Sequence, residues 1–185
     1  MSSETINHVV DAAKQIPSKV ADEVSSELAE HENGAERPIV GYAMLLGTYA
    51  AGVAGLSYVV RKQGRPLPLR PDPRDLVLIS MATHKVSRML AKDTVLAPFR
   101  AAFTRFKEPA GAGEVNEEVR GTGPRHAVGE LVTCPFCLAQ WVATGFTFGL
   151  ILAPRATRLA AGVFCTVAAS DALQFAYAAL EKTSD

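Results

Sequence analysis

A long stretch without charge constrains this chain more than any other feature of its sequence. Residues 39–60 contain no Asp, Glu, Lys or Arg, and a helix needs roughly 20 apolar residues to cross the hydrocarbon core of a bilayer. Tyr42 and Tyr58 lie near the two ends of this stretch, where aromatic rings favour the membrane–water interface. Residues 131–153 and 159–180 are two further apolar blocks, and the five-residue polar stretch between them predicts a helical hairpin. The chain therefore contains three candidate transmembrane helices.

A fourth helix is predicted over residues 75–91, with Asp75 as its N-cap. Its first half is apolar, but its second half carries His84, Lys85 and Arg88, so it is too polar to cross a membrane comfortably alone. The predicted fold class is all-α: a small helical membrane protein with three transmembrane helices plus one amphipathic or re-entrant helix, and with an N-terminal amphipathic helix.

Two regions are expected along the chain. Residues 1–37 form an acidic, amphipathic or partly disordered N-terminal extension, in which apolar residues recur at helical spacing and Pro17 interrupts the pattern. This extension lacks the charged-then-apolar order of a signal peptide. Residues 38–182 form a helical membrane domain with a basic polar loop at about 92–130, and the part at 108–125 is expected to be a mobile loop.

The basic residues predict an orientation. Thirteen of the nineteen Lys and Arg residues lie between Arg61 and Arg125. If the helix at 75–91 does not cross, this whole basic middle region lies on one side, which the positive-inside tendency makes the cytoplasmic side. The N-terminus is then outside and the C-terminus inside. If that helix does cross, the bias mostly disappears.

The Cys134-Pro-Phe-Cys137 motif is the main candidate for chemistry. Two thiols at this spacing can share one zinc ion or exchange with a disulfide, because one helical turn brings both sulfur atoms together. A structural zinc site takes four ligands, and no second Cys pair is present. The residues available to complete such a site are His126, His84, Cys165 and Glu130. Packing thiols, a metal site and a redox pair all remain open, and zinc is the one cofactor that the pattern indicates.

An acidic residue inside the last apolar block predicts a polar contact within the bundle. Asp171 is expensive to place in lipid unless it is paired, and His84, Lys85 and Arg88 are its candidate partners. The pairing can serve as an internal salt bridge that docks the polar helix, which we favour, or as a path for a small solute. Glu130 precedes an apolar block and is expected to pair with a nearby arginine.

Three sequence runs resemble a known family. They are the run ATHKVSR at 82–88, Lys92-Asp93 followed by Pro98-Phe-Arg100, and the run GELVTCPFC at 129–137 before Trp141. In this order they resemble motifs of the DUF1360 family of uncharacterised bacterial membrane proteins, over roughly residues 75–155. The resemblance implies a multi-pass protein of the bacterial cytoplasmic (inner) membrane and names no activity.

The remaining features favour an accessory role over catalysis. Gly47, Ala51 and Gly55 recur every fourth residue, which gives one smooth face for helix packing. No nucleophile–base set and no phosphate-binding loop is evident, so no enzyme is expected, and a net charge of zero argues against nucleic acid. The expected partners are the lipid bilayer and a protein partner or a second copy of the chain. We hypothesise a scaffold or partner-recruiting subunit, with a metal-binding or redox-sensing thiol protein and a solute path past Asp171 as the alternatives.

Overall fold

The computed structural model describes Asp22, Ser26 and residues 38–68 and 70–184. The predicted N-terminal amphipathic helix lies outside the described residues, apart from Asp22 and Ser26. The chain divides into two units, residues 1–39 and 40–185. The second unit contains every feature described below.

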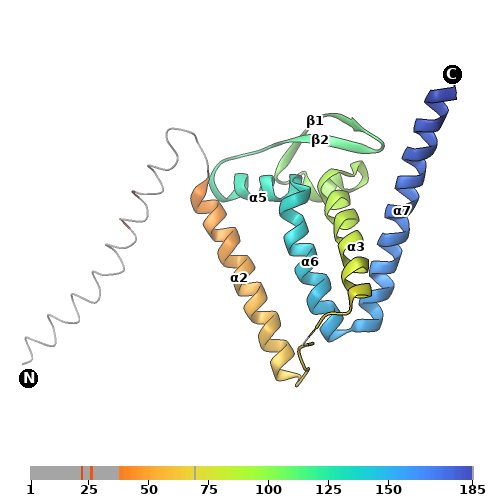
Figure 1. The fold of residues 1–185 in the computed structure, drawn as a ribbon. Coiled ribbons are helices and arrows are strands. Elements are labelled where there is room, and N and C mark those ends of the chain that lie inside the picture. The colour runs from red at the N-terminus through yellow and green to blue at the C-terminus, as the bar shows by residue number, and fades with distance from the viewer. Residues whose placement is uncertain (1–21, 23–25, 27–37, 69, 185) are drawn as a thin grey trace, which may run out of the picture. The chain divides into compact units, whose positions relative to one another are not determined.

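The described part of the chain is mainly helical, and the all-α prediction is confirmed (Figure 1). Its long helices are α2 (Ile39–Lys62), α3 (Pro73–Lys92), α5 (Gly123–Thr133), α6 (Pro135–Leu152) and α7 (Pro154–Ser184). Between α3 and α5 lie a short 3-10 helix, η1 (Thr94–Leu96), the single turn α4 (Ala97–Arg100), and the strands β1 (Thr104–Gly111) and β2 (Glu114–Val119). The two strands form a small antiparallel sheet that the sequence did not predict.

Three helices are long and apolar enough to cross a membrane, as predicted. They are α2, α6 and α7, with 24, 18 and 31 residues, and few of their residues are buried inside the protein. At 1.5 Å per residue the shortest of them covers roughly 27 Å, close to the thickness of the hydrocarbon core. Surfaces of this kind are stable in lipid rather than in water.

The helix boundaries differ from the predicted blocks at two prolines. The block at 131–153 is broken at Cys134, whose backbone is extended (φ −102°, ψ 105°), so α5 ends at Thr133 and α6 begins at Pro135. The residue before a proline disfavours the helical conformation, while proline suits the first turn of a helix. The predicted turn at 154–158 is wrong for the same reason, because Pro154 already begins α7.

Helix α3 packs lengthwise against α6 and α7 and does not lie across their ends (Figure 1). One face is buried along most of its length, through Ile79, Ala82, Thr83, Ser87 and Ala91. Its N-cap is Asp72, whose carboxylate accepts the backbone N–H of Arg74 at 2.8 Å, so the prediction of Asp75 as the cap is wrong. Asp75 instead pairs with Arg158 of α7 at 2.7 Å.

The predicted mobile loop at 108–125 is wrong, because most of it is a β-hairpin. Strands β1 and β2 pair from Thr104 with Val119 to Gly111 with Glu114. The turn between them needs left-handed backbone at Gly111, Ala112 and Gly113, which two glycines supply without strain. β1 is exposed at every position after Thr104, so its sequence lacks the alternation of apolar and polar residues that would predict a strand.

A buried arginine attaches this hairpin to the bundle. Arg100 is only 2% exposed, and its guanidinium donates to the backbone oxygens of Leu90 at 2.8 Å and Asp93 at 2.9 Å. The same group pairs with Glu117 of β2. Arg100 therefore joins the end of α3, the α4 turn and the hairpin.

Candidate functional site

A cavity of about 820 Å³ lies between α2, α5 and α6. This volume falls in the range of small-molecule sites, roughly 300–1,000 Å³. The residues around it are largely apolar or uncharged, and Glu130 is the one lining residue of the described chain that carries a charge. The lining consists of Tyr42, Leu45, Leu46, Tyr49, Ala127, Glu130, Leu131, Thr133, Cys134, Cys137, Gln140 and Trp141.

The close approach of α2 to α5 sets one end of the cavity. A Cβ at Gly41 would lie 2.7 Å from the Cβ of Ala127 and 3.1 Å from the backbone oxygen of Gly123, so only glycine fits there. Further along α2, Leu46 lines the cavity and is still 69% exposed. The cavity is therefore open along α2.

The polar end of the cavity is built around Glu130. Its carboxylate accepts a hydrogen bond from the Tyr42 hydroxyl, and the Nε2 atom of His126 lies 3.7 Å away, one helical turn earlier. The sequence predicted an arginine partner for Glu130. The structure places Tyr42 and His126 there instead.

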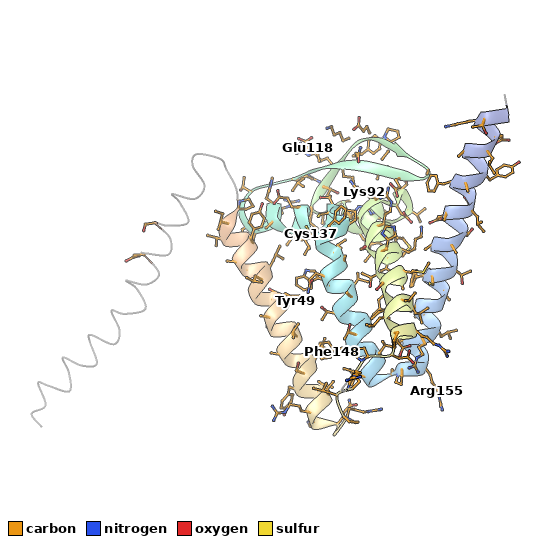
Figure 2. The ribbon with its side chains drawn as sticks, viewed as in Figure 1. Tyr49, Lys92, Glu118, Cys137, Phe148 and Arg155 are labelled. Atoms are coloured by element: carbon orange, nitrogen blue, oxygen red, sulfur yellow. The ribbon has the colours of Figure 1, made fainter. Side chains whose placement is uncertain are left out.

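The middle of the cavity is bridged by Tyr49 (Figure 2), whose side chain lies between α2 and α6. Its hydroxyl shares a 2.8 Å hydrogen bond with Thr144 and accepts the Gln140 side-chain N–H at 2.7 Å. Its ring meets Trp141 edge-to-face, with 5.2 Å between centroids. These contacts hold α2 against α6 across an otherwise apolar gap.

Both thiols of the Cys-x-x-Cys motif line this cavity. Cys134 and Cys137 are free, and the Cys134 sulfur caps α6 by accepting the backbone N–H of Cys137 at 3.2 Å. Cys137 is exposed, near the end of α6 that faces the hairpin (Figure 2). One turn of helix thus presents two neighbouring sulfur atoms to the cavity.

The structure does not gather a zinc ligand set around these thiols. Within residues 38–68 and 70–184, no three His, Cys, Asp or Glu side chains form a group that could hold a metal ion. His84 lies in α3 beside a different cavity, and Cys165 of α7 contacts the Met81 sulfur at 3.5 Å. The donor set among the described residues therefore does not fit the four ligands of a structural zinc.

A second cavity, of about 730 Å³, lies between α3, α7 and the hairpin turn. Of the three candidate partners of Asp171, the structure pairs Lys85 with it at 2.7 Å. Arg88 forms a two-point contact with Glu114 of β2 at 2.6 and 2.8 Å, and His84 lines the same cavity. The pairing of Lys85 with Asp171 agrees with the internal salt bridge that the sequence favours for docking the polar helix.

Several residues of the first cavity were missed from the sequence. Tyr42 and Tyr49 are seven residues apart and so lie on one face of α2, a signal that could have linked them. Their partners on α5 and α6 are some 90 residues away, which no local pattern shows. The small-residue face of Gly47, Ala51 and Gly55 is exposed, and a Cβ at either glycine would have open space around it.

These features define a small helical membrane protein with three helices able to cross a bilayer and a lateral cavity. The chain belongs to the DUF1360 family, described as proteins of unknown function, whose family model matches residues 78–177. It is also 38% identical, over 71 residues, to the sporulation protein YjcA of Bacillus subtilis. That match covers 37% of this chain and 60% of the relative, and no solved structure matches the chain.

The motif that carried the family resemblance maps onto the first cavity. Glu130, Leu131, Cys134, Cys137 and Trp141 all line it. Gly129 lies beneath the hairpin, where a Cβ would meet Val119 and come within 3.0 Å of the Phe103 backbone oxygen. Residues 129–141 therefore form one wall of the cavity, and Gly129 provides the surface against which the hairpin packs.

Proposed function

We propose that this chain is a multi-pass accessory protein of the bacterial cytoplasmic membrane, without catalytic activity of its own, in which α3 crosses together with α2, α6 and α7. The observation that carries the proposal is the nearly constant register between α3 and α7. Asp75 pairs with Arg158, Met81 contacts Cys165, and Lys85 pairs with Asp171. The partners are 83, 84 and 86 residues apart, so the two helices run parallel, side by side, along most of α3. A helix so placed shares the membrane depth of α7.

Two cations of α3 are compatible with this depth because they are paired. Lys85 meets Asp171, and Arg88 meets Glu114 at the hairpin end. Ionisable groups inside a membrane usually face the bundle and pair with one another. With 20 residues, α3 covers roughly 30 Å, enough to cross the hydrocarbon core.

If α3 crosses the bilayer, the linker after α2 and the polar region at 92–125 lie on opposite sides of the membrane. The 63–72 linker and the α6–α7 turn lie at one end of the bundle, and the hairpin lies at the other, as Arg155 and Glu118 illustrate (Figure 2). Arg61, Lys62, Arg65, Arg70 and Arg74 crowd the linker end, and the nearby turn adds Arg155 and Arg158. Residues 92–125 at the hairpin end carry six Lys and Arg, so the two ends differ little in number. The seven cations of the linker end, however, lie in two short connections beside the helix ends, where the positive-inside tendency acts. On this ground we place the linker end in the cytoplasm and the hairpin outside, in contrast to a wholly cytoplasmic basic middle region.

Cysteine labelling tests this topology. In a chain with its three cysteines replaced by serine, Gln63→Cys and Ala110→Cys place single thiols in the linker and in β1, both at exposed positions. In intact cells a membrane-impermeant maleimide should label Ala110→Cys and label Gln63→Cys only after lysis. Labelling of both positions from the same side would mean that α3 does not cross.

The partner surface of this accessory role is proposed to be the small-residue face of α2. Gly47→Leu/Gly55→Leu fills open space and should leave the fold intact while reducing the mass of the detergent-solubilised assembly. The matched control is Gly145→Leu on α6, a glycine with equally open surroundings. An unchanged assembly mass in the double variant would remove this surface from the proposal.

A second candidate function rests on the adjacent thiols in the cavity. With the hairpin end outside the cytoplasm, Cys134 and Cys137 lie toward an oxidising compartment. There they can exchange with a partner protein's disulfide: the two thiols become a disulfide as the partner's disulfide becomes two thiols. Thiol trapping in cells should then find a mixture of oxidised and reduced forms. Complete and permanent reduction of both thiols would exclude this role.

A further inference from the structure

We propose that the cavity between α2, α5 and α6 binds a membrane lipid whose head carries a primary ammonium group, with Glu130 as the acceptor for that group and one acyl chain held between α2 and α6. The inference rests on the membrane insertion proposed above. It assigns a class of ligand to this cavity, for which the proposed accessory role names none.

The charge of the lining selects the head group. Among the residues that the structure describes, Glu130 carries the one charge in the lining, and none of the lining residues is a lysine or arginine. Its carboxylate has the neutral donor Tyr42, and His126 at 3.7 Å is beyond hydrogen-bond distance. The side chain is 42% exposed, so its oxygens remain accessible from the cavity. A carboxylate in this position favours a cationic hydrogen-bond donor and disfavours an anionic head.

The walls of the cavity select the rest of the ligand. Leu45, Leu46, Leu131 and Trp141 provide apolar surface below Glu130. Leu46 is 69% exposed and the cavity is open along α2, which is itself apolar enough to cross a membrane. A ligand that enters from this side arrives from lipid. An acyl chain fits the apolar walls while its head reaches the carboxylate.

The chain contains a built-in reporter of this site. Trp141 is its single tryptophan, and it lines the cavity. A lipid with a brominated acyl chain quenches tryptophan fluorescence when the chain lies against the ring. The dependence of quenching on lipid fraction therefore measures relative occupancy.

The full chain is reconstituted into phosphatidylcholine vesicles that contain increasing fractions of brominated phosphatidylethanolamine, phosphatidylglycerol or phosphatidylcholine. Phosphatidylethanolamine should occupy the site about tenfold more favourably than the other two, the size expected for a charge-assisted hydrogen bond. Glu130→Gln should abolish this preference. Glu118→Gln, at an exposed hairpin position outside the lining, should retain it.

A second reporter separates the cavity from bulk lipid. In a Trp141→Phe chain, Val163→Trp places the tryptophan at a 55% exposed position on α7, where no lipid preference is expected. Equal quenching of Trp141 by all three lipids, equal quenching by phosphatidylethanolamine and phosphatidylcholine, or no quenching at all would each overturn the inference. A chain that fails to float with the vesicles would instead contradict the membrane insertion, so the two failures are distinguishable.

Discussion

Arg100 connects three elements: the end of α3, the α4 turn and the hairpin. It is buried, it pairs with the buried Glu117, and it donates to the backbone oxygens of Leu90 and Asp93. Because a buried carboxylate that loses its partner remains unpaired, Arg100→Gln should destabilise the fold by about 3–5 kcal/mol. Thermal unfolding in detergent measures the effect.

The double variant isolates the unpaired charge. Arg100→Gln/Glu117→Gln should recover part of the lost stability, since neither charge is then buried alone. Arg105→Gln, at an exposed position in β1, serves as the control and should change little. Equal melting temperatures for the Arg100 and Arg105 variants would show that the pair does not hold the hairpin.

Thr83 presents the opposite case, a buried hydroxyl without a hydrogen-bond partner in the part of the chain that the structure describes. Replacing an unsatisfied polar group with an apolar one of the same shape is neutral or stabilising. Thr83→Val should therefore retain or raise the melting temperature. Ser87→Ala should lower it, because the Ser87 hydroxyl donates to the His84 backbone oxygen at 3.1 Å. A marked loss of stability in Thr83→Val would contradict this, because it would mean that the hydroxyl makes a stabilising hydrogen bond in the folded protein.

Among the elements, the hairpin packs closely against α5 at Gly129. Gly129→Ala would drive a methyl group into Val119 and toward the Phe103 backbone, so it should destabilise the hairpin by about 1–3 kcal/mol and raise amide exchange in β1 and β2. Gly145→Ala, with open space at its Cβ, is the matched control and should gain about 0.5–1 kcal/mol from helix propensity. Unchanged exchange in the hairpin of the Gly129 variant would contradict this packing.

Some of these elements were predictable from the sequence and others were not. The three apolar helices were predictable because hydrocarbon requires an uninterrupted apolar run. The break at Cys134 had a signal in Pro135, because proline suits the first turn of a helix and disfavours helical backbone at the residue before it. The hairpin had none, since β1 is exposed and carries Pro109 and two register irregularities. Glycine-rich, charged sequence of this kind is typical of loops as well.

At the scale of the whole molecule, the position of α3 was not predictable from its own residues. Its polarity argues against crossing, and the groups that offset this polarity, Asp171 and Glu114, are 86 and 26 residues away from their partners. The cavity, too, was only partly predictable from local sequence. Its thiols and Glu130 were identified from a local motif, whereas the tyrosines that close it come from a helix far away in the sequence.

The central claim is that α2, α6 and α7 reside in a bilayer and bring α3 with them. Fractionation of cells that express the full chain tests it most directly, with a wash at alkaline pH to strip proteins that are only attached to the membrane surface. We expect the protein to sediment with the membranes, to resist the wash and to be released only by detergent. A folded protein that remains dispersed in the soluble fraction without detergent would contradict the claim.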